Sequence, residues 1–299
     1  MSENAAPPHN GPARGGEEEG EKTTSIRIAS YNIRNGRAGG LEAALRAMAQ
    51  ANVDLGVFQE TKLTDGIYTR QSSGYQVIAS DAPSKHQGGI AVFWRDSPHW
   101  QIEAYQAFGP NVVSFQLTSG RRERWYVVGA YIPPHDTATL EYVSKALEAR
   151  PEGEDPILIG DLNANLADPE SARAGKIADT LAAHGLEDMF GHFRQRRPYR
   201  DGNTWSMLRQ GRLITSRCDY LLGVDRRTFL NVCLKAPRYN SDHYMILGTI
   251  RSAKLKENRV YLRGRHNIPL NPPTARPMTQ ADCMFEELQS SAERNQRIR

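Results

Sequence analysis

Apolar residues recur along the chain with two kinds of spacing. The segment SIRIASYNI (25–33) alternates apolar and polar positions, which is typical of a strand with two unlike faces. Leu41, Leu45 and Met48 then recur at helical spacing, and the continuous apolar run 55–58 follows them. The pattern predicts a strand, a helix and a second strand in that order.

The middle and the end of the chain add further strands and one more helix. Leu140, Val143 and Leu147 share one helical face, with Asp136 or Thr137 available as the N-cap. Apolar runs predict strands at 75–79, 90–94, 112–117, 125–132, 156–160, 219–224 and 245–250. Because some strands follow one another directly and others are separated by helices, mixed sheets covered by helices are favoured over a regular alternation.

The two ends of the sequence differ in composition from the middle. Residues 1–24 are rich in Gly, Pro and Glu and carry too little apolar surface to offset the entropy lost on ordering, so we expect a disordered leader. Residues 252–299 are expected to form a basic, Pro-containing linker, in which the capping-box spacing of Thr279 and Asp282 predicts a short helix at 279–295. One folded domain is expected at 25–251.

Composition argues against several classes of protein. No stretch reaches the roughly 18 to 20 uninterrupted apolar residues of a membrane span, and the polar, acidic start is unlike a secretory signal. Cys218, Cys233 and Cys283 lack paired spacing, which predicts free thiols rather than a disulfide framework or a zinc ribbon. We expect an intracellular protein, with the nucleus as one candidate compartment. The net charge of +4 is a weak bias toward polyanions.

Polar residues stand where the apolar strand segments end. Such positions are fixed in space and project side chains into a shared cleft. Taken singly, Glu60 is more simply a surface acid, and 161–163 an Asx turn. Carboxylate and amide oxygens without a cysteine cluster select magnesium or manganese rather than zinc. The full set, whose joint occurrence indicates a site, comprises Asn32, Glu60, Tyr131, Asp161, Asn163, Asp219, Asp242 and His243.

The motifs around these residues resemble those of a known superfamily. SYNIR, QET, GAYIPP, GDLNA, SRCDYLL and SDH occur in the order found in the DNase I-like endonuclease/exonuclease/phosphatase superfamily, over about residues 25–251. QETK, KHQGGIAVFW and DYLL resemble most the endonuclease domain of LINE-type non-LTR retrotransposons. The resemblance implies a four-layer α/β sandwich, in which two mixed β-sheets pack face to face and are flanked by helices.

The resemblance also implies a metal site and a catalytic base. Glu60 would bind the metal directly, with Asn32 and Asp242 completing the polar shell of a magnesium ion, or of manganese. Asp161 would orient and deprotonate the attacking water, while Asn163 would donate a hydrogen bond to the scissile phosphate.

The remaining site residues would contact the phosphate by the same resemblance. His243, held by Asp219, would be its cationic or hydrogen-bonding partner, and Tyr131 would offer its phenol. In-line attack would leave a 3′-hydroxyl and a 5′-phosphate. Arg34 departs from the related apurinic endonucleases, which usually have an acidic or amide residue there, so strong activity at abasic sites and a second metal site are not expected.

Substrate contacts are expected from arginines between the predicted strands and from a Thr-Trp element. Arg197, Arg200 and Arg217 are suited to bidentate contact with phosphate, although loop arginines are often only solvated charge. Thr204-Trp205 matches the family's Thr-Trp element, and these residues would support the cleft or contact a sugar or base. The expected partner is DNA, bound with an affinity that falls as salt rises.

Two other functions remain open from the sequence. A phosphatase or phosphodiesterase of the same fold that acts on inositol phosphates or lipids would use the same metal and Asp-His chemistry. A catalytically inactive scaffold remnant is the second alternative, and the retention of all the site residues disfavours it. The sequence does not indicate the oligomeric state.

Overall fold

The computed structural model of the chain describes residues 25–64, 68–119, 123–136, 138–193, 201–236 and 241–252. The predicted leader at 1–24 lies outside the described residues, and so does the predicted linker beyond Ser252, with its short helix. None of the helices in the described part of the chain is long and apolar enough to cross a membrane.

One sheet has seven strands and contains the N-terminal strand. Its order is β14 (Phe229–Lys235), β15 (Met245–Arg251), β1 (Ser25–Asn32), β2 (Leu55–Gln59), β5 (Ile90–Trp94), β4 (Tyr75–Ala79) and β3 (Tyr68–Ser72). β1 and β2 are parallel, because α1 (Gly40–Gln50) carries the chain back between them, and every other neighbouring pair is antiparallel.

The second sheet has six strands and is also mixed. Its order is β10 (Glu187–Asp188), β13 (Asp219–Gly223), β9 (Asp155–Asp161), β8 (Glu123–Tyr131), β7 (Val112–Ser119) and β6 (Trp100–Gly109). Its single parallel pair, β8 and β9, is connected by α2 (Ala138–Glu148). Asp136 is the N-cap side chain of this helix, since its carboxylate accepts hydrogen bonds from the backbone N–H groups of Ala138 at 2.8 Å and Thr139 at 3.3 Å.

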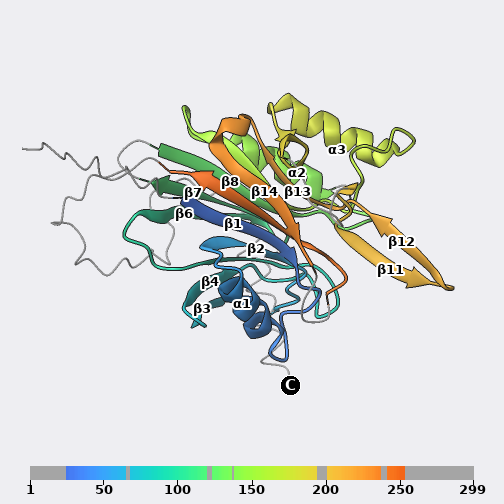
Figure 1. The fold of residues 1–299 in the computed structure, drawn as a ribbon, viewed down its shortest axis with the longest axis horizontal. Helices are drawn as coiled ribbons and strands as arrows, with labels where there is room; N and C mark the ends of the chain where they lie inside the picture. The colour runs from blue at the N-terminus through green and yellow to red at the C-terminus, as the bar shows by residue number, and fades with distance from the viewer. Residues whose placement is uncertain are drawn as a thin grey trace, which may run out of the picture. The chain divides into compact units, whose positions relative to one another are not determined.

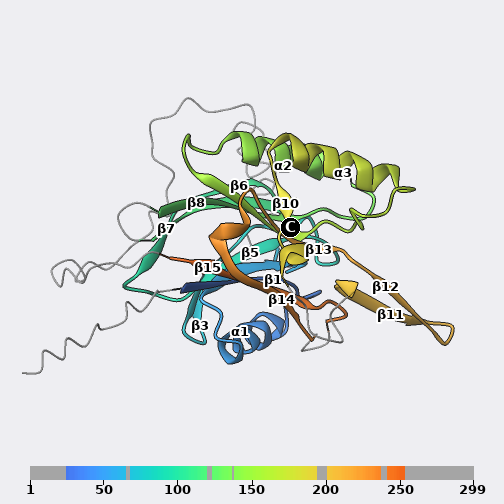
Figure 2. The ribbon, with the colours of Figure 1, turned by 45° about the horizontal axis from the view of Figure 1, so that its top comes forward.

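The two sheets pack face to face between helices. Close approach is helped by Gly129, where a Cβ atom would lie 3.0 Å from the side chain of Val57, and by Gly248, where it would lie 2.6 Å from that of Leu221. α1 covers the outer face of the seven-stranded sheet, and α2 and α3 (Ala172–Ala183) cover that of the six-stranded sheet (Figures 1 and 2). The expected four-layer α/β sandwich is confirmed.

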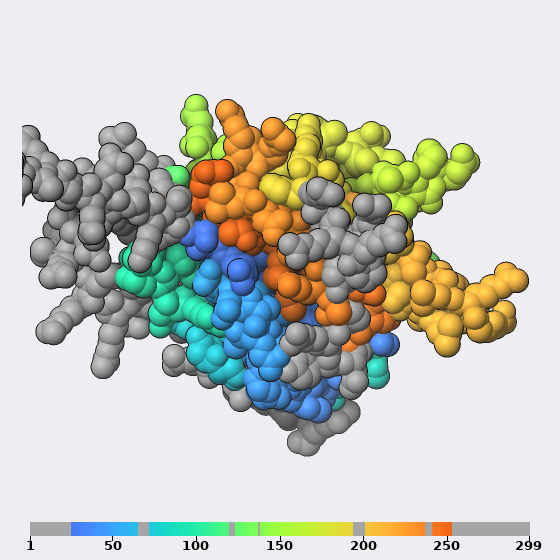
Figure 3. All heavy atoms as spheres, viewed as in Figure 1, coloured from blue at the N-terminus to red at the C-terminus, as the bar shows by residue number. Residues whose placement is uncertain are grey.

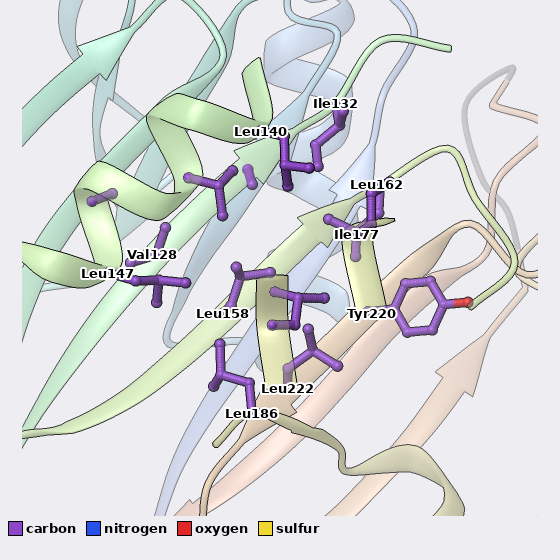
Figure 4. Close-up of a cluster of buried hydrophobic side chains, with 14 of the residues drawn as sticks. Val128, Ile132, Leu140, Leu147, Leu158, Leu162, Ile177, Leu186, Tyr220 and Leu222 are labelled. Atoms are coloured by element: carbon purple, nitrogen blue, oxygen red, sulfur yellow. The ribbon is translucent and has the colours of Figure 1, made fainter. Parts of the chain in front are cut away.

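The outer core of the six-stranded sheet shows why the apolar pattern predicts these layers. Leu140 and Leu147 of α2 and Ile177 of α3 project onto Leu158 and Leu222 of the sheet (Figure 4). These side chains are almost fully buried, and the transfer of such residues from water contributes about 1.5 to 3 kcal/mol each. The apolar faces of the helices and of the strands therefore pack into one hydrophobic cluster.

Several elements were not predicted from the apolar pattern. They are β3, β6, β14, α3 and the hairpin of β11 (Trp205–Arg209) and β12 (Arg212–Ser216), together with the short β10 and the single turns η1 (Phe190–His192) and η3 (Arg226–Thr228). β6 exposes half of its residues and the hairpin exposes most of them, so their sequences lack a continuous apolar face. Among the described residues the hairpin pairs outside itself only at its base, through the bridge between Trp205 and His243, and its distal part projects away from the two sheets (Figures 1 and 3).

Candidate active site

The predicted site residues converge where strands of both sheets end. β1 ends at Asn32, and Glu60 directly follows β2, its parallel neighbour. In the other sheet Asp161 is in register with Tyr131 on one side and with Asp219 on the other. Strand register alone therefore places these side chains in two neighbouring groups, one from each sheet.

Asn32 joins the two groups. Its amide Nδ2 donates to Glu60 Oε1 at 3.1 Å and to Asp161 Oδ2 at 2.8 Å. Asn32 is fully buried, so both carboxylates are held by a side chain that has no alternative partner in solvent. This amide fixes the spacing between a carboxylate of the seven-stranded sheet and one of the six-stranded sheet.

Behind Asn32 lies a buried acid-imidazole group. His243 Nδ1 donates to Asp219 Oδ2 at 2.8 Å, and His243 Nε2 lies 4.0 Å from Asp161 Oδ2. Asp161 and Asp219 are fully buried and His243 is 5% exposed. The imidazole is therefore oriented by one carboxylate and presents its other nitrogen toward the second.

Burial and charge set the protonation of this group. Burial acts to lower the pKa of His243, but the charge and hydrogen bond of Asp219 outweigh it and raise the pKa to about 9. Burial, followed by the charge of Asp219, raises the pKa of Asp161 above its ordinary range. At neutral pH His243 is thus an imidazolium, and Asp161 is a stronger base than an exposed aspartate.

Glu60 has a second partner that the sequence did not suggest. Burial acts to raise the pKa of Glu60, but hydrogen bonds from Asn32 and Lys62 and the charge of Lys62 outweigh it and lower the pKa. Lys62 Nζ lies 2.9 Å from Glu60 Oε2, and the phenol of Tyr131 donates to Oε1 at 3.2 Å. The sequence feature that could have indicated Lys62 is its position in the QETK motif, two residues after Glu60.

Tyr131 and Asn163 line the same group from the ends of β8 and β9. Burial and then the charges of Glu60 and Asp161 raise the pKa of Tyr131, so its phenol keeps its proton. Asn163 has a φ of 47°, its N–H donates to Asp161 Oδ1 at 2.9 Å, and its Nδ2 donates to the carbonyl of Ile132 at 3.1 Å. Asn163 therefore closes the turn that orients Asp161, and its side chain also forms a hydrogen bond with Tyr131.

Thr204 and Trp205 contact other residues of the site, and their expected contact with substrate stays a prediction. Thr204 is fully buried, and its Oγ1 accepts the backbone N–H groups of Cys218 and Asp219, each at 2.9 Å. Trp205 Nε1 donates to Asp242 Oδ2 at 3.0 Å. Because their polar atoms are used in this way, both residues position acids of the site.

The phosphate contact expected of Arg217 also stays a prediction, and in the structure this side chain contacts an acid and two rings. Its guanidinium lies 2.5 Å from Asp188 Oδ2 and stacks over the rings of Phe190 and Tyr220. Only 17% of its side chain is exposed, so this arginine holds η1 against β13. Arg197 and Arg200 lie outside the described residues.

The donor set fits a hard divalent cation. Glu60 and Asp242, each with about 20% of the side chain exposed, are the open carboxylates. Asp242 Oδ1 is buried and accepts no hydrogen bond within the described part of the chain, although it lies 3.4 Å from Arg34 Nε. Carboxylate oxygens with the amide oxygen of Asn32 are ligands that magnesium and manganese favour.

A second grouping could be considered for the metal. Asp161, Asp219 and His243 offer ligand atoms within 4.8 Å of one another. In this group the imidazole already donates to Asp219 through Nδ1. Glu60 and Asp242 are the more exposed acids, whereas Asp161, Asp219 and His243 are buried.

Comparison with known proteins agrees with this geometry. The model of the "Endonuclease/Exonuclease/phosphatase family" matches residues 29–243, which include all the site residues from Asn32 to His243. No curated protein sequence matches this chain.

Several solved structures share the fold. The "Endonuclease domain of TRAS1, a telomere-specific non-LTR retrotransposon" aligns with a TM-score of 0.59 and 19% identity, covering 78% of this chain and all of that one. The Xenopus laevis APE2 catalytic domain aligns with a TM-score of 0.58 and 19% identity, covering 77% of this chain and 94% of that one. The Leishmania major AP endonuclease LMAP aligns with a TM-score of 0.58 and 16% identity, covering 76% of this chain and 88% of that one.

Proposed function

Because the chain belongs to the endonuclease/exonuclease/phosphatase family, we propose that it is a magnesium-dependent endonuclease that nicks DNA and leaves a 3′-hydroxyl and a 5′-phosphate. The fold is that of phosphodiesterases and nucleases. The observation that carries the proposal is the double hydrogen bond of Asn32, which holds an open carboxylate, Glu60, beside a buried one, Asp161. In this proposal Glu60 would act as a metal ligand and Asp161 as a base at the same phosphate.

Glu60, Asn32 and Asp242 would hold the magnesium ion, and manganese has the same ligand preference. When bound, such an ion neutralises negative charge that develops on the phosphate during displacement. Trp205 fixes Asp242 through Nε1, and Tyr131 fixes Glu60 through its phenol. The ligands are therefore oriented by the protein before any substrate arrives.

Asp161 would orient the attacking water and accept its proton. Its buried carboxylate is held by Asn32 and by the backbone of Asn163, and its raised pKa suits proton acceptance near neutral pH. The water oxygen bonds to phosphorus, and the bond from phosphorus to the 3′ oxygen breaks. The side-chain amide of Asn163 would donate a hydrogen bond to the phosphate during this exchange.

The His243 imidazolium would stabilise the charge on the phosphate and supply a proton to the leaving 3′ oxygen. Asp219 keeps the ring charged and oriented through Nδ1, which leaves the Nε2–H free to point at the substrate. Tyr131 keeps its proton, and its single O–H would turn from Glu60 Oε1 to the same phosphate when substrate binds.

DNA is the substrate that we propose over inositol phosphates or lipids. Its support comes from structural neighbours, which include a retrotransposon endonuclease domain, the APE2 catalytic domain and an AP endonuclease. A nick that ends in a 3′-hydroxyl is one that a retroelement polymerase can extend, so target-site cleavage is the role that we propose. Such an enzyme acts where DNA is, inside the cell and, in nucleated cells, in the nucleus.

A supercoiled-plasmid nicking assay tests the proposal. Wild-type protein is expected to nick with magnesium and to stop when EDTA is added. Glu60→Gln and His243→Ala are each expected to lower the rate by at least about 100-fold, because a metal ligand or a charge-stabilising donor is lost. The matched controls are Glu141→Gln and His99→Ala, which change exposed residues outside the site.

Analysis of the ends and of alternative substrates completes the assay. The nicks are expected to be sealed by a ligase without prior phosphorylation, which requires a 3′-hydroxyl and a 5′-phosphate. Nicking at the wild-type rate by both site variants would overturn the assignment. Release of phosphate from inositol phosphates, without plasmid nicking, would favour the phosphatase alternative.

A further inference from the structure

A pocket of about 410 Å³ opens beside Glu60 on the side of Lys62. It is lined by Asn35, Arg37, Ala38, Lys62, Lys85 and His86. Three of these residues are permanent cations, one is an imidazole, one is an amide, and none is acidic. The pocket thus offers donors and positive charge but no anionic ligand, which suits an anion and excludes a metal ion.

Three separate loops build the pocket and are tied together by backbone hydrogen bonds. The N–H of Gly36 donates to the carbonyl of Thr61 at 2.8 Å, and the N–H groups of Thr61 and Lys62 donate to Gly89 and Gly88 at 3.2 and 3.0 Å. A Cβ atom on Gly36 would lie 2.9 Å from the carbonyl oxygen of Thr61, so the loops are in close contact. The cations are therefore presented by a connected backbone rather than by independent surface loops.

The positive charge of the pocket is largely uncompensated. Among the described residues, neither Arg37 nor Lys85 forms an ion pair with a carboxylate. Lys62 is the exception, since its Nζ lies 2.9 Å from Glu60 Oε2. Lys62 therefore borders both the pocket and the open carboxylate of the candidate metal site.

We propose that this pocket binds a second phosphate group of the substrate, next to the one that is cleaved. The inference rests on the proposed function, because it takes Glu60 as the place of the scissile phosphate and its metal. Consecutive phosphates of one DNA strand are about 3.4 Å apart along the helix axis, so a strand held at Glu60 must carry another phosphate close by. Arg37, Lys62 and Lys85 receive that phosphate, and Asn35 donates to it.

The salt dependence of DNA binding tests the pocket separately from catalysis. Binding of a short fluorescent DNA duplex is measured in EDTA at increasing KCl, with wild-type protein and the double variant Arg37→Gln/Lys85→Gln. Loss of one phosphate contact reduces the slope of log K against log salt by about 0.9. Lys62 is kept unchanged, because its contact with Glu60 would confuse the result.

Arg150→Gln is the matched control. Arg150 follows α2, which packs against the other sheet, and its side chain is exposed, so the slope is expected to stay at the wild-type value. Circular dichroism of each variant confirms that it is folded. A double variant that is folded and has the wild-type slope would overturn the pocket as a phosphate site.

A second arm distinguishes a nucleic-acid phosphate from that of a small molecule. Titration with an inositol bisphosphate and an inositol monophosphate compares the same two proteins. We expect the double variant to bind DNA more weakly than wild type and to bind the inositol phosphates equally well, which would assign the pocket to a DNA strand. Weaker binding to the bisphosphate alone overturns the DNA assignment. If wild-type protein fails to nick plasmid while the slope still changes, the proposed function fails and the pocket stands.

Discussion

At the scale of the residue, His243 shows how one neighbour sets the chemistry of another. The ring is buried, which by itself would favour the neutral form, yet the carboxylate of Asp219 at 2.8 Å keeps it charged. Asp219 is in turn held by the hydroxyl of Thr204, which accepts its backbone N–H. Charge on the imidazole therefore depends on a chain of contacts that reaches back to the Thr-Trp element.

The pKa of His243 is expected to fall toward its ordinary value of about 6.5 in Asp219→Asn. NMR titration of the imidazole in EDTA measures it, with a pKa of about 9 expected for the wild-type protein. Because the folded pKa lies above the unfolded one, protonation stabilises the native state below pH about 6.5, and this contribution is lost as pH rises toward 9. The variant His243→Gln identifies the resonance, and an unchanged pKa in Asp219→Asn would refute the coupling.

Thr204→Val is expected to lower the free energy of unfolding by about 1 to 3 kcal/mol. The substitution keeps the shape but removes the acceptor of two buried backbone N–H groups, those of Cys218 and Asp219. Chemical denaturation measures the change, and Thr204→Ser, which keeps the hydroxyl, is the control. A loss no larger than that of Thr204→Ser would show that the hydrogen bonds contribute little.

At the scale of the element, the hairpin of β11 and β12 differs from every other strand pair. Its strands belong to no larger sheet of the described chain, and the turn at Gln210-Gly211 has positive φ at both residues, as a tight hairpin requires. Its base is fixed to the site, since Trp205 bonds to Asp242 and the N–H of Ser206 donates to the carbonyl of Asp242 at 3.1 Å. The distal part carries four exposed apolar side chains, Met207, Leu208, Leu213 and Ile214.

Replacing residues 207–214 by an Asn-Gly turn is expected to leave the midpoint of thermal unfolding within about 2 °C of wild type. Ser206 and Thr215 are paired, so such a turn joins them without moving Trp205. Differential scanning fluorimetry measures the midpoint, with the alanine variant of the exposed Leu208 as a milder control. A fall of many degrees would mean that the distal hairpin supports the core.

At the scale of the whole molecule, the site exists only where the two sheets face each other. Asn32 and Glu60 come from the seven-stranded sheet, and Asp161 and Asp219 come from the six-stranded sheet. His243 lies just before β15, and its pairing with Asp219 links the sheets again. A cation that needs ligands fixed in this way binds the native state alone and so stabilises it.

Magnesium or manganese is expected to raise the midpoint of thermal unfolding, and EDTA to reverse the rise. A ligand at 100 times its dissociation constant adds about 2.7 kcal/mol, which corresponds to several degrees in a domain of this size. Glu60→Gln is expected to abolish most of the rise, and Glu141→Gln to retain it. An equal rise in both variants would mean that the metal does not bind at Glu60.

Much of this organisation followed from the sequence. The apolar runs predicted β2, β4, β5, β9, β13 and β15 closely, because buried strands need an apolar residue at nearly every position. Exposed elements such as the hairpin were missed, since their residues have no core to match. The polar residues at strand ends were found for a related reason, because each interrupts a pattern that burial otherwise enforces.

Only the tertiary structure decided how those residues act on one another. The sequence could propose Asn32, Glu60 and Asp161 as members of one site, but strand register and the packing of two sheets made one amide bond to both acids. It could not indicate that Lys62 would pair with Glu60, or that Arg217 would turn toward Asp188. Residue type and periodicity are local properties of the chain, whereas distance, burial and pKa depend on segments far apart in sequence.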